Sequence, residues 1–128
     1  MPAMAAQPRR VLVGYDGSSS GQRALEAAAA LVGYGSTLAV VSVGALGGDD
    51  TEEVLDDARR RLRERRLPVT YLLRRGDAAD ELVDAVHVLG ANLLVVGART
   101  QNGRVRHGLG AVSGDVVRRA PCDVLVVR

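Results

Sequence analysis

The chain has 128 residues, of which 47% are hydrophobic and 25% are charged, and this composition is typical of one globular domain. All 17 basic residues are arginines, which excludes a Schiff-base lysine and a phosphate loop of the GxxxxGK[ST] type. The formal net charge of +2 and the absence of Trp and Phe argue against nucleic-acid binding.

The N-terminal segment contains no targeting or membrane-spanning signal that we can identify. MPAMAAQPRR lacks the apolar middle of a secretory signal, and no apolar run reaches the ~18 residues needed to cross a bilayer. We therefore expect a cytoplasmic protein without a membrane partner. Residues 1–8 are expected to be a disordered tail, and residues 9–128 to form one domain.

Apolar runs alternate with helical spacing along the chain, and turn residues separate them. The predicted order is a strand over 10–15, a helix within 18–35, a strand over 37–43, a helix after Asp50, a strand over 69–73, a helix between Asp77 and Gly90, a strand over 92–96, a short helix over 113–119 and a strand over 123–127. This alternation predicts the α/β class, with three α/β/α layers and a parallel sheet whose crossovers are right-handed.

Capping residues set the expected helix ends. The serines after Gly17 supply an N-cap for the first helix, and Gly33 or Gly35 supplies its stop. Asp50 with Glu53 fits a capping pair for the second helix, although Thr51 could cap instead. The arginine-rich run RRRLRERR on that helix is interpreted as a solvated face rather than a nucleic-acid patch, because acidic residues nearby offset its charge.

A ligand site is expected where the first and fourth strands end, because ligands of doubly wound sheets bind beyond the carboxyl ends of the strands. Asp16 follows the first strand, where it can accept hydrogen bonds from ribose or an amino group, or can serve as a turn or capping residue. Gly97 opens the loop after the fourth strand. That loop is rich in glycine and carries Arg99, Arg104, Arg106 and His107, so it either holds phosphates or only connects a strand to a helix.

Three segments together resemble the universal stress protein family over nearly the whole chain. They are VLVGYDGSSSGQRAL near the start, RRGDAADELVDAVHVLGANLLVVGAR in the middle and GAVSGDVVRRAPCDVLVVR at the end. The resemblance implies a five-stranded parallel sheet in the order 3-2-1-4-5, of the Rossmann-like type that binds adenine nucleotides. It also implies a homodimer formed through the C-terminal strands, which would cover an otherwise exposed edge.

Many members of that family bind ATP, accompanied by Mg²⁺, through a spaced glycine motif. The resemblance places the nucleotide site on Gly14, Tyr15, Asp16, Val43, Val96, Gly97, Arg99, Thr100, Gly110, Ala111, Val112 and Ser113. Gly97 and Gly110 match motif glycines, and Val43 falls at the adenine contact. Thr100 stands where the second glycine is expected, and Ala111 stands where a hydroxyl residue is expected.

We therefore predict a dimeric stress-response regulator that binds ATP or another adenine nucleotide, and not an enzyme. Because Thr100 and Ala111 depart from the motif, the alternative is a nucleotide-independent interaction module of the same fold. A nucleotide hydrolase is a third reading, although the two histidines, His87 and His107, stand on separate elements. A phosphoacceptor receiver domain is excluded because the chain has no lysine.

Overall fold

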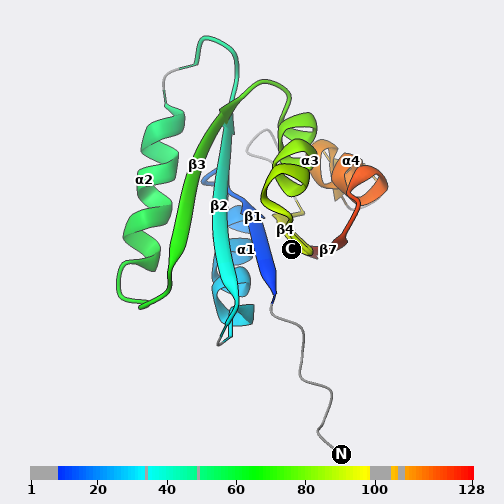
Figure 1. The fold of residues 1–128 in the computed structure, drawn as a ribbon. Helices are drawn as coiled ribbons and strands as arrows, with labels where there is room; N and C mark the ends of the chain where they lie inside the picture. The colour runs from blue at the N-terminus through cyan, green and yellow to red at the C-terminus, as the bar shows by residue number, and fades with distance from the viewer. Residues whose placement is uncertain (1–8, 34, 49, 99–104, 107–108) are drawn as a thin grey trace, which may run out of the picture.

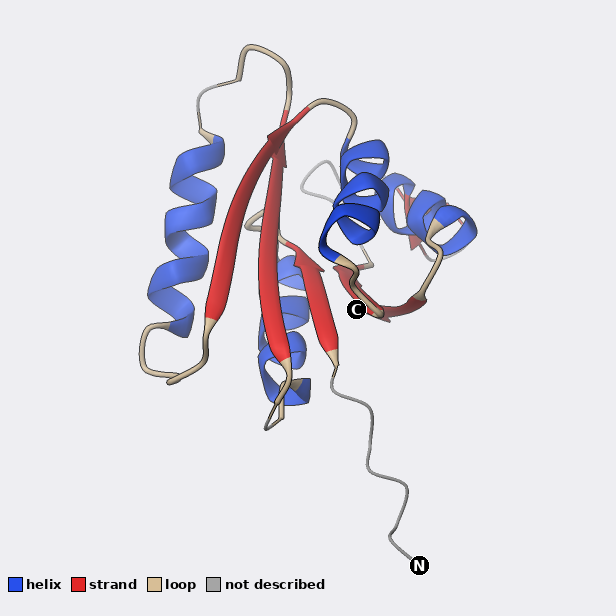
Figure 2. Ribbon diagram, in the orientation of Figure 1, coloured by secondary structure: helices blue, strands red, loops and turns tan. Residues whose placement is uncertain are grey.

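A computed structural model describes residues 9–33, 35–48, 50–98, 105–106 and 109–128. In chain order the elements are β1 (Arg10–Gly14), α1 (Ser19–Leu31), β2 (Thr37–Gly44), α2 (Thr51–Leu62), β3 (Val69–Arg75), α3 (Ala78–Leu89), β4 (Leu93–Gly97), β5 (Val105–Arg106), β6 (Leu109–Gly110), α4 (Ala111–Arg119) and β7 (Asp123–Val127). Figure 1 shows these elements along the chain, and Figure 2 shows helices on both sides of the strands.

Five strands form one parallel sheet in the order β3-β2-β1-β4-β7. Since β7 is the fifth strand of this sheet in chain order, the predicted order 3-2-1-4-5 is confirmed. The α/β class is confirmed too. The sequence analysis did not predict the short antiparallel pair β5–β6, which lies in the connection between β4 and α4.

The sheet is buried on both faces, which explains why its strands read as nearly continuous apolar runs. On β1, Val11 and Val13 pack into the cluster that includes side chains of α1 and α2. Leu12 points the other way, into the cluster that includes side chains of α3 and α4. This alternation follows from the two-residue period of a strand.

Three helix ends lie where the sequence predicts them, and the structure shows what caps each one. The Ser18 hydroxyl accepts a hydrogen bond from the Gly21 amide at 3.0 Å and caps α1. Asp77 caps α3 by accepting from the Asp80 amide at 3.0 Å, and Gly90 ends α3 in the left-handed region with φ of 64°. The predicted stop of α1 at Gly33 or Gly35 is close to the observed one: the C-cap is Val32 in an extended conformation, and Gly33 follows it without a positive φ.

Three other boundaries differ from the prediction. The Asp50–Glu53 capping pair is wrong: Asp50 is the N-cap of α2 but has φ −93° and ψ 2°, and its side chain makes no capping hydrogen bond. β3 continues to Arg75, beyond its predicted end at residue 73. In this extension, the guanidinium of Arg74 lies 2.8 Å from an Asp84 carboxylate oxygen on α3. α4 begins at Ala111, two residues earlier than expected.

The helices after β1 and β4 leave toward opposite faces of the sheet, since α1 belongs to one core cluster and α4 to the other. β1 and β4 are neighbours in the sheet. Their carboxyl ends, Gly14 and Gly97, therefore flank the crevice at which doubly wound folds bind ligands.

Candidate functional site

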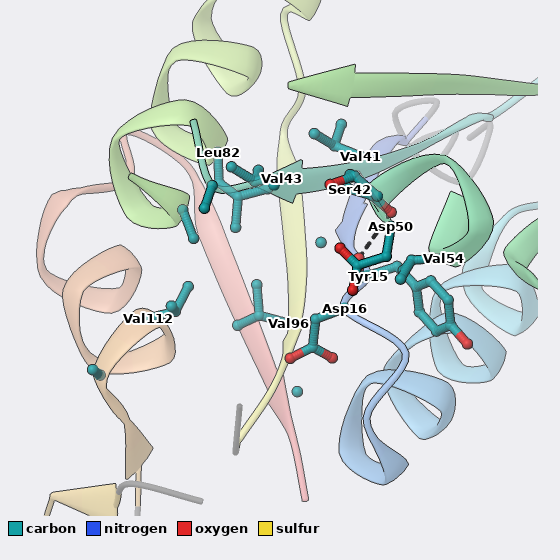
Figure 3. A pocket seen from close by; sticks show the side chains of 17 residues that line it. Tyr15, Asp16, Val41, Ser42, Val43, Asp50, Val54, Leu82, Val96 and Val112 are labelled. Carbon is teal, nitrogen blue, oxygen red and sulfur yellow. Dashed lines mark hydrogen bonds between the residues drawn. The ribbon is translucent and has the colours of Figure 1, made fainter. Parts of the chain in front are cut away.

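A cavity of about 570 Å³ opens at this point (Figure 3). β1, β2 and β4 form its floor, and the first turns of α2, α3 and α4 contribute to its walls. The described lining residues are Gly14, Tyr15, Asp16, Val41, Ser42, Val43, Gly44, Ala45, Asp50, Thr51, Val54, Ala78, Leu82, Val96, Gly97, Ala111 and Val112. The volume is large enough for a small organic ligand, and the walls are mainly aliphatic.

The predicted site residues are largely brought together by this cavity. Eight of them line it: Gly14, Tyr15, Asp16, Val43, Val96, Gly97, Ala111 and Val112. Gly110 is not a lining residue but is the N-cap of α4, directly before Ala111. Arg99 and Thr100 lie outside the described residues, as do Arg104 and His107. Ser113 is described but is not among the residues that line the cavity.

Gly97 is required by packing as well as by any ligand. A Cβ atom at this position would lie 2.7 Å from the Ser20 carbonyl carbon and 2.8 Å from the Gly21 amide nitrogen. These atoms belong to the backbone of α1, so they cannot rotate away from an added Cβ as a side chain could. The absence of a side chain at Gly97 thus lets the end of β4 lie directly against the first turn of α1.

Asp16 holds the turn after β1 and also lines the cavity. Its Oδ1 accepts hydrogen bonds from the Ser18 amide at 2.9 Å and from the Ser18 hydroxyl at 2.6 Å. Ser18 then caps α1, so Asp16 is a turn residue and not the N-cap. Because both of these hydrogen bonds use Oδ1, Oδ2 is the oxygen through which Asp16 can accept from a ligand.

Val43 presents main-chain groups at the crevice because β2 runs past the end of β1. The β1–β2 ladder ends at the pair Gly14 and Val41, and the Tyr15 amide donates to the Val41 carbonyl at 2.9 Å. Gly44 faces the other way, since its carbonyl accepts from the Gly76 amide at 2.9 Å. By alternation, the amide and carbonyl of Val43 point to the side that β1 has left, where they can pair with the edge of a planar base.

Ser42 and Tyr15 support the floor, and their polar atoms are engaged within the protein. The buried Ser42 hydroxyl donates to the Tyr15 carbonyl at 2.8 Å (Figure 3). The Tyr15 phenol donates to Asp57 of α2, and Arg61 Nε lies 2.8 Å from the same carboxylate. Burial and the hydrogen bond to Asp57 raise the pKa of Tyr15 to about 12. The hydrogen bonds from Tyr15 and Arg61 lower the pKa of Asp57.

The amino end of α4 closes the opposite side of the cavity. Gly110 is its N-cap and contributes no side-chain hydrogen bond, and the first turn contains no acidic residue. The first amides of this nine-residue helix therefore offer donors and a positive dipole end toward Ala111 and Val112, which line the cavity. Such an end favours an anionic group.

Ser113 occupies a different environment from the one expected of a phosphate ligand. It is 1% exposed, and its hydroxyl lies 3.0 Å from the Ala98 carbonyl and 3.1 Å from the Gly110 carbonyl. This hydroxyl ties α4 to the end of β4. In the described arrangement it therefore does not compensate for the hydroxyl that Ala111 lacks.

The arginine-rich end of α2 is largely neutralised by carboxylates. Arg59 pairs with Asp56 at 2.5 Å, Arg61 with Asp57 at 2.8 Å, and Arg65 with Glu26 of α1. These exposed pairs favour the interpretation of a solvated face.

The described residues include no group of three or more His, Cys, Asp or Glu side chains that could hold a metal ion. His87 is exposed on α3. In the part of the chain that the structure describes, no helix has the length and hydropathy needed to span a membrane.

Sequence reasoning missed the wall built by α2 and α3. Asp50, Thr51, Val54, Ala78 and Leu82 line the cavity, yet none was predicted as a site residue. The order of elements could have indicated these residues. Because all five strands are parallel, the loops after β2 and β3 begin at the same edge of the sheet as the loops after β1 and β4. The helices that follow those loops begin beside the crevice.

Comparison with known proteins identifies close parallels to this architecture. The model of the universal stress protein family matches residues 8–128. The stress response protein NhaX of Bacillus subtilis (strain 168) is 30% identical over 80 residues, which are 62% of this chain and 48% of that protein. The chain thus matches about half the length of that relative.

Solved structures share the fold over almost the whole chain. A universal stress protein in complex with cAMP has 29% identity and a TM-score of 0.78, with 95% of this chain and 98% of that chain covered. A universal stress protein from Archaeoglobus fulgidus in complex with dAMP has 24% identity and a TM-score of 0.73, with coverage of 94% and 98%. The second likeness supports the fold alone.

Proposed function

Because this chain belongs to the universal stress protein family, we propose that it is a stress-response regulator that binds an adenine nucleotide in the cavity between β1 and β4. One observation carries the proposal: a single cavity presents the Val43 main chain, the Asp16 carboxylate and the amino end of α4. These groups suit a base, a sugar and a phosphate respectively. The relative bound to cAMP supports the same ligand class.

The base would lie on the β2 side of the cavity. Val41, Val43 and Val54 supply apolar contacts there, and the main-chain amide and carbonyl of Val43 can pair with the donor and acceptor edge of adenine. Leu82 of α3 adds a further apolar surface. No aromatic stacking partner is needed, because aliphatic side chains can enclose the faces of a planar ring.

The ribose and phosphate would lie toward β4 and α4. Asp16 Oδ2 can accept hydrogen bonds from ribose hydroxyls, and the first amides of α4 can donate to phosphate oxygens. Figure 3 shows Asp16 with Val96 and Val112 across the cavity from it. ATP is one candidate within this class, and any Mg²⁺ would be held chiefly by the phosphates of the nucleotide.

Calorimetry with the full chain tests this function. We expect AMP or ATP to bind with micromolar affinity. Asp16→Asn keeps the shape and the Oδ1 acceptor of the turn but removes the charge, and we expect it to weaken binding about tenfold or more. Asp56→Asn removes an exposed carboxylate outside the lining and should leave affinity unchanged.

A second variant separates phosphate from nucleoside recognition. Ala111→Glu places a carboxylate in the first turn of α4, which suits the helix dipole but repels a phosphate at the same end. Its affinity for AMP should fall at least tenfold, whereas its affinity for adenosine should change little. The absence of binding heat for every adenine nucleotide, with a folded protein, would overturn the proposed function.

The alternative is an interaction module that does not use a nucleotide. The engaged Ser113 hydroxyl and the missing hydroxyl at Ala111 favour it, because together they leave fewer side-chain donors for phosphate. Under this alternative the cavity would bind none of the tested ligands. The proposed role as a regulator rather than an enzyme, and the cytoplasmic location, remain predictions in either case.

We also propose a homodimer formed through β7. This strand is at the edge of the sheet and pairs with β4 alone among the described strands. Leu125 on β7 is 38% exposed. Pairing with a second copy would give the backbone N–H and C=O groups of this edge hydrogen-bond partners and would cover the Leu125 side chain.

A further inference from the structure

The start of α2 is held unusually close to the end of β2. A Cβ atom at Gly44 would lie 1.8 Å from Thr51 Oγ1 and 3.0 Å from Thr51 Cβ. Gly44 therefore allows Thr51, which is only 5% exposed, to lie directly over the last residue of the strand. As a result Asp50, the residue before Thr51, is placed at the rim of the cavity and lines it.

The Asp50 carboxylate is not used by its own helix. The main-chain carbonyl of Asp50 accepts from the Val54 amide at 3.1 Å, but the side chain makes no capping hydrogen bond. Glu52 and Glu53 already place acidic groups in the first turn of α2. Among the described residues, the ion pairs made by acidic side chains do not include Asp50.

The position of Asp50 assigns it to the base end of the cavity. It comes from the same helix as Val54, on the β2 side, whereas Val112 and the amino end of α4 belong to the opposite side (Figure 3). A carboxylate at the phosphate end would repel an anion. At the base end it faces a neutral ring, where it can accept hydrogen bonds and nothing else.

We propose that Asp50 determines base specificity by accepting a hydrogen bond from the 6-amino group of the purine. This inference rests on the proposed function. The exocyclic amino group of adenine has two N–H donors, one for the Val43 carbonyl and one for Asp50. A 6-keto purine presents an acceptor instead, and its oxygen would face the carboxylate without a proton between them. A site built to accept from an N–H group rejects an analogue that lacks it.

Paired titrations of the full chain with AMP and IMP test this role, because the two ligands share the same sugar and phosphate. We expect the unmodified protein to prefer AMP about tenfold or more. Asp50→Asn keeps the shape but can donate to a keto oxygen, so the preference should shrink about tenfold. Glu53→Gln changes another exposed carboxylate in the same turn, outside the lining, and should leave the ratio of AMP to IMP affinity unchanged.

The outcomes separate this inference from the proposed function. If AMP binds and Asp50→Asn leaves the ratio of affinities unaltered, the role of Asp50 is wrong and nucleotide binding stands. Stronger binding of GMP than of AMP by the unmodified protein would also overturn it, because a carboxylate can accept from the N–H groups of guanine. If no nucleotide binds, both proposals fail. Asp50 is exposed and caps nothing with its side chain, so circular dichroism should show a folded variant.

Discussion

Tyr15 links the floor of the cavity to α2 through one hydrogen bond. Its side chain is 2% exposed, and its phenol donates to Asp57, whose carboxylate also meets Arg61. Tyr15 is a lining residue, its side chain belongs to the core cluster beneath α1 and α2, and its phenol faces α2. Tyr15 therefore positions the cavity wall, and its hydroxyl is not offered to a ligand.

At the residue scale, the burial of Tyr15 and this hydrogen bond together predict a specific alkaline transition. Tyr15 has a pKa of about 12 in the folded protein against 10.0 when unperturbed, so the unfolded chain loses its proton first. The stabilisation is fully present below pH ~10 and is lost as the pH rises toward about 12. Denaturation midpoints measured across this range should fall in the unmodified protein.

Tyr15→Phe removes that contribution. The variant should be less stable by about 1–2 kcal/mol at neutral pH, where the hydrogen bond to Asp57 is intact. Between pH ~10 and ~12, the free energy of unfolding of this variant should decrease less than that of the unmodified protein. The chain has no lysine, so tyrosines dominate this range. Burial also raises the pKa of Tyr71, so Tyr71→Phe measures the share of the alkaline loss that comes from this second tyrosine. Parallel curves for Tyr15→Phe and the unmodified protein would contradict the assignment.

At the scale of elements, the contact between Gly44 and Thr51 predicts a cost for adding one methyl group. Gly44→Ala must displace Thr51, since the two atoms would otherwise lie 1.8 Å apart, and α2 must shift with it. We expect destabilisation of about 1–3 kcal/mol, typical of overpacking. Chemical denaturation provides the measurement.

Two companion variants make that result interpretable. Gly33→Ala has nothing within 4 Å of the added carbon and should be neutral or slightly stabilising. In the Gly44→Ala background, Thr51→Ala removes the clashing oxygen and should restore part of the loss, measured as a coupling in a double-mutant cycle. A Gly44→Ala variant as stable as Gly33→Ala would show that α2 does not depend on this approach.

Elements with strong local signals were predictable, and those fixed by tertiary contacts were not. The Ser18 cap, the Asp77 cap and the Gly90 stop follow from side chains that bond their own backbone or from a positive φ. The unused cap at Asp50 was not predictable, because its backbone has φ −93° and ψ 2° instead of the extended conformation of a capping residue. The extension of β3 is paired with β2, where Arg74 lies opposite Val43 and Arg75 opposite Gly44.

The same distinction applies to the candidate site. Asp16 and Gly97 could be placed from the order of elements alone, because both stand at the carboxyl ends of strands that flank the switch point. Asp50 could not, since its place at the cavity results from the approach of α2 to Gly44. The engagement of Ser113 with the Ala98 carbonyl was equally hidden, because the donor and acceptor are separated by the loop.

At the scale of the whole molecule, the two edges of the sheet are chemically different. The β3 edge carries charge at its end, and Arg59 of α2 lies 4.9 Å from the centre of the Tyr71 ring. Charged side chains discourage further strand pairing. β7 reads DVLVV and carries only one charged side chain, at its first residue. The strand most suited to pairing with a second copy is therefore β7.

The expected dimer can be tested by sedimentation and by one substitution at that edge. The unmodified protein should sediment with twice the 13.5 kDa mass of the chain. Leu125→Arg places an arginine on β7 of both copies, and the two positive charges would repel each other at the interface. The dimer dissociation constant should therefore rise at least tenfold. Val88→Arg alters a side chain that is 66% exposed on α3 and should leave the dimer intact. A Leu125→Arg variant that dimerises like the unmodified protein would place the interface elsewhere, and a monomeric unmodified protein would leave β7 as an open edge.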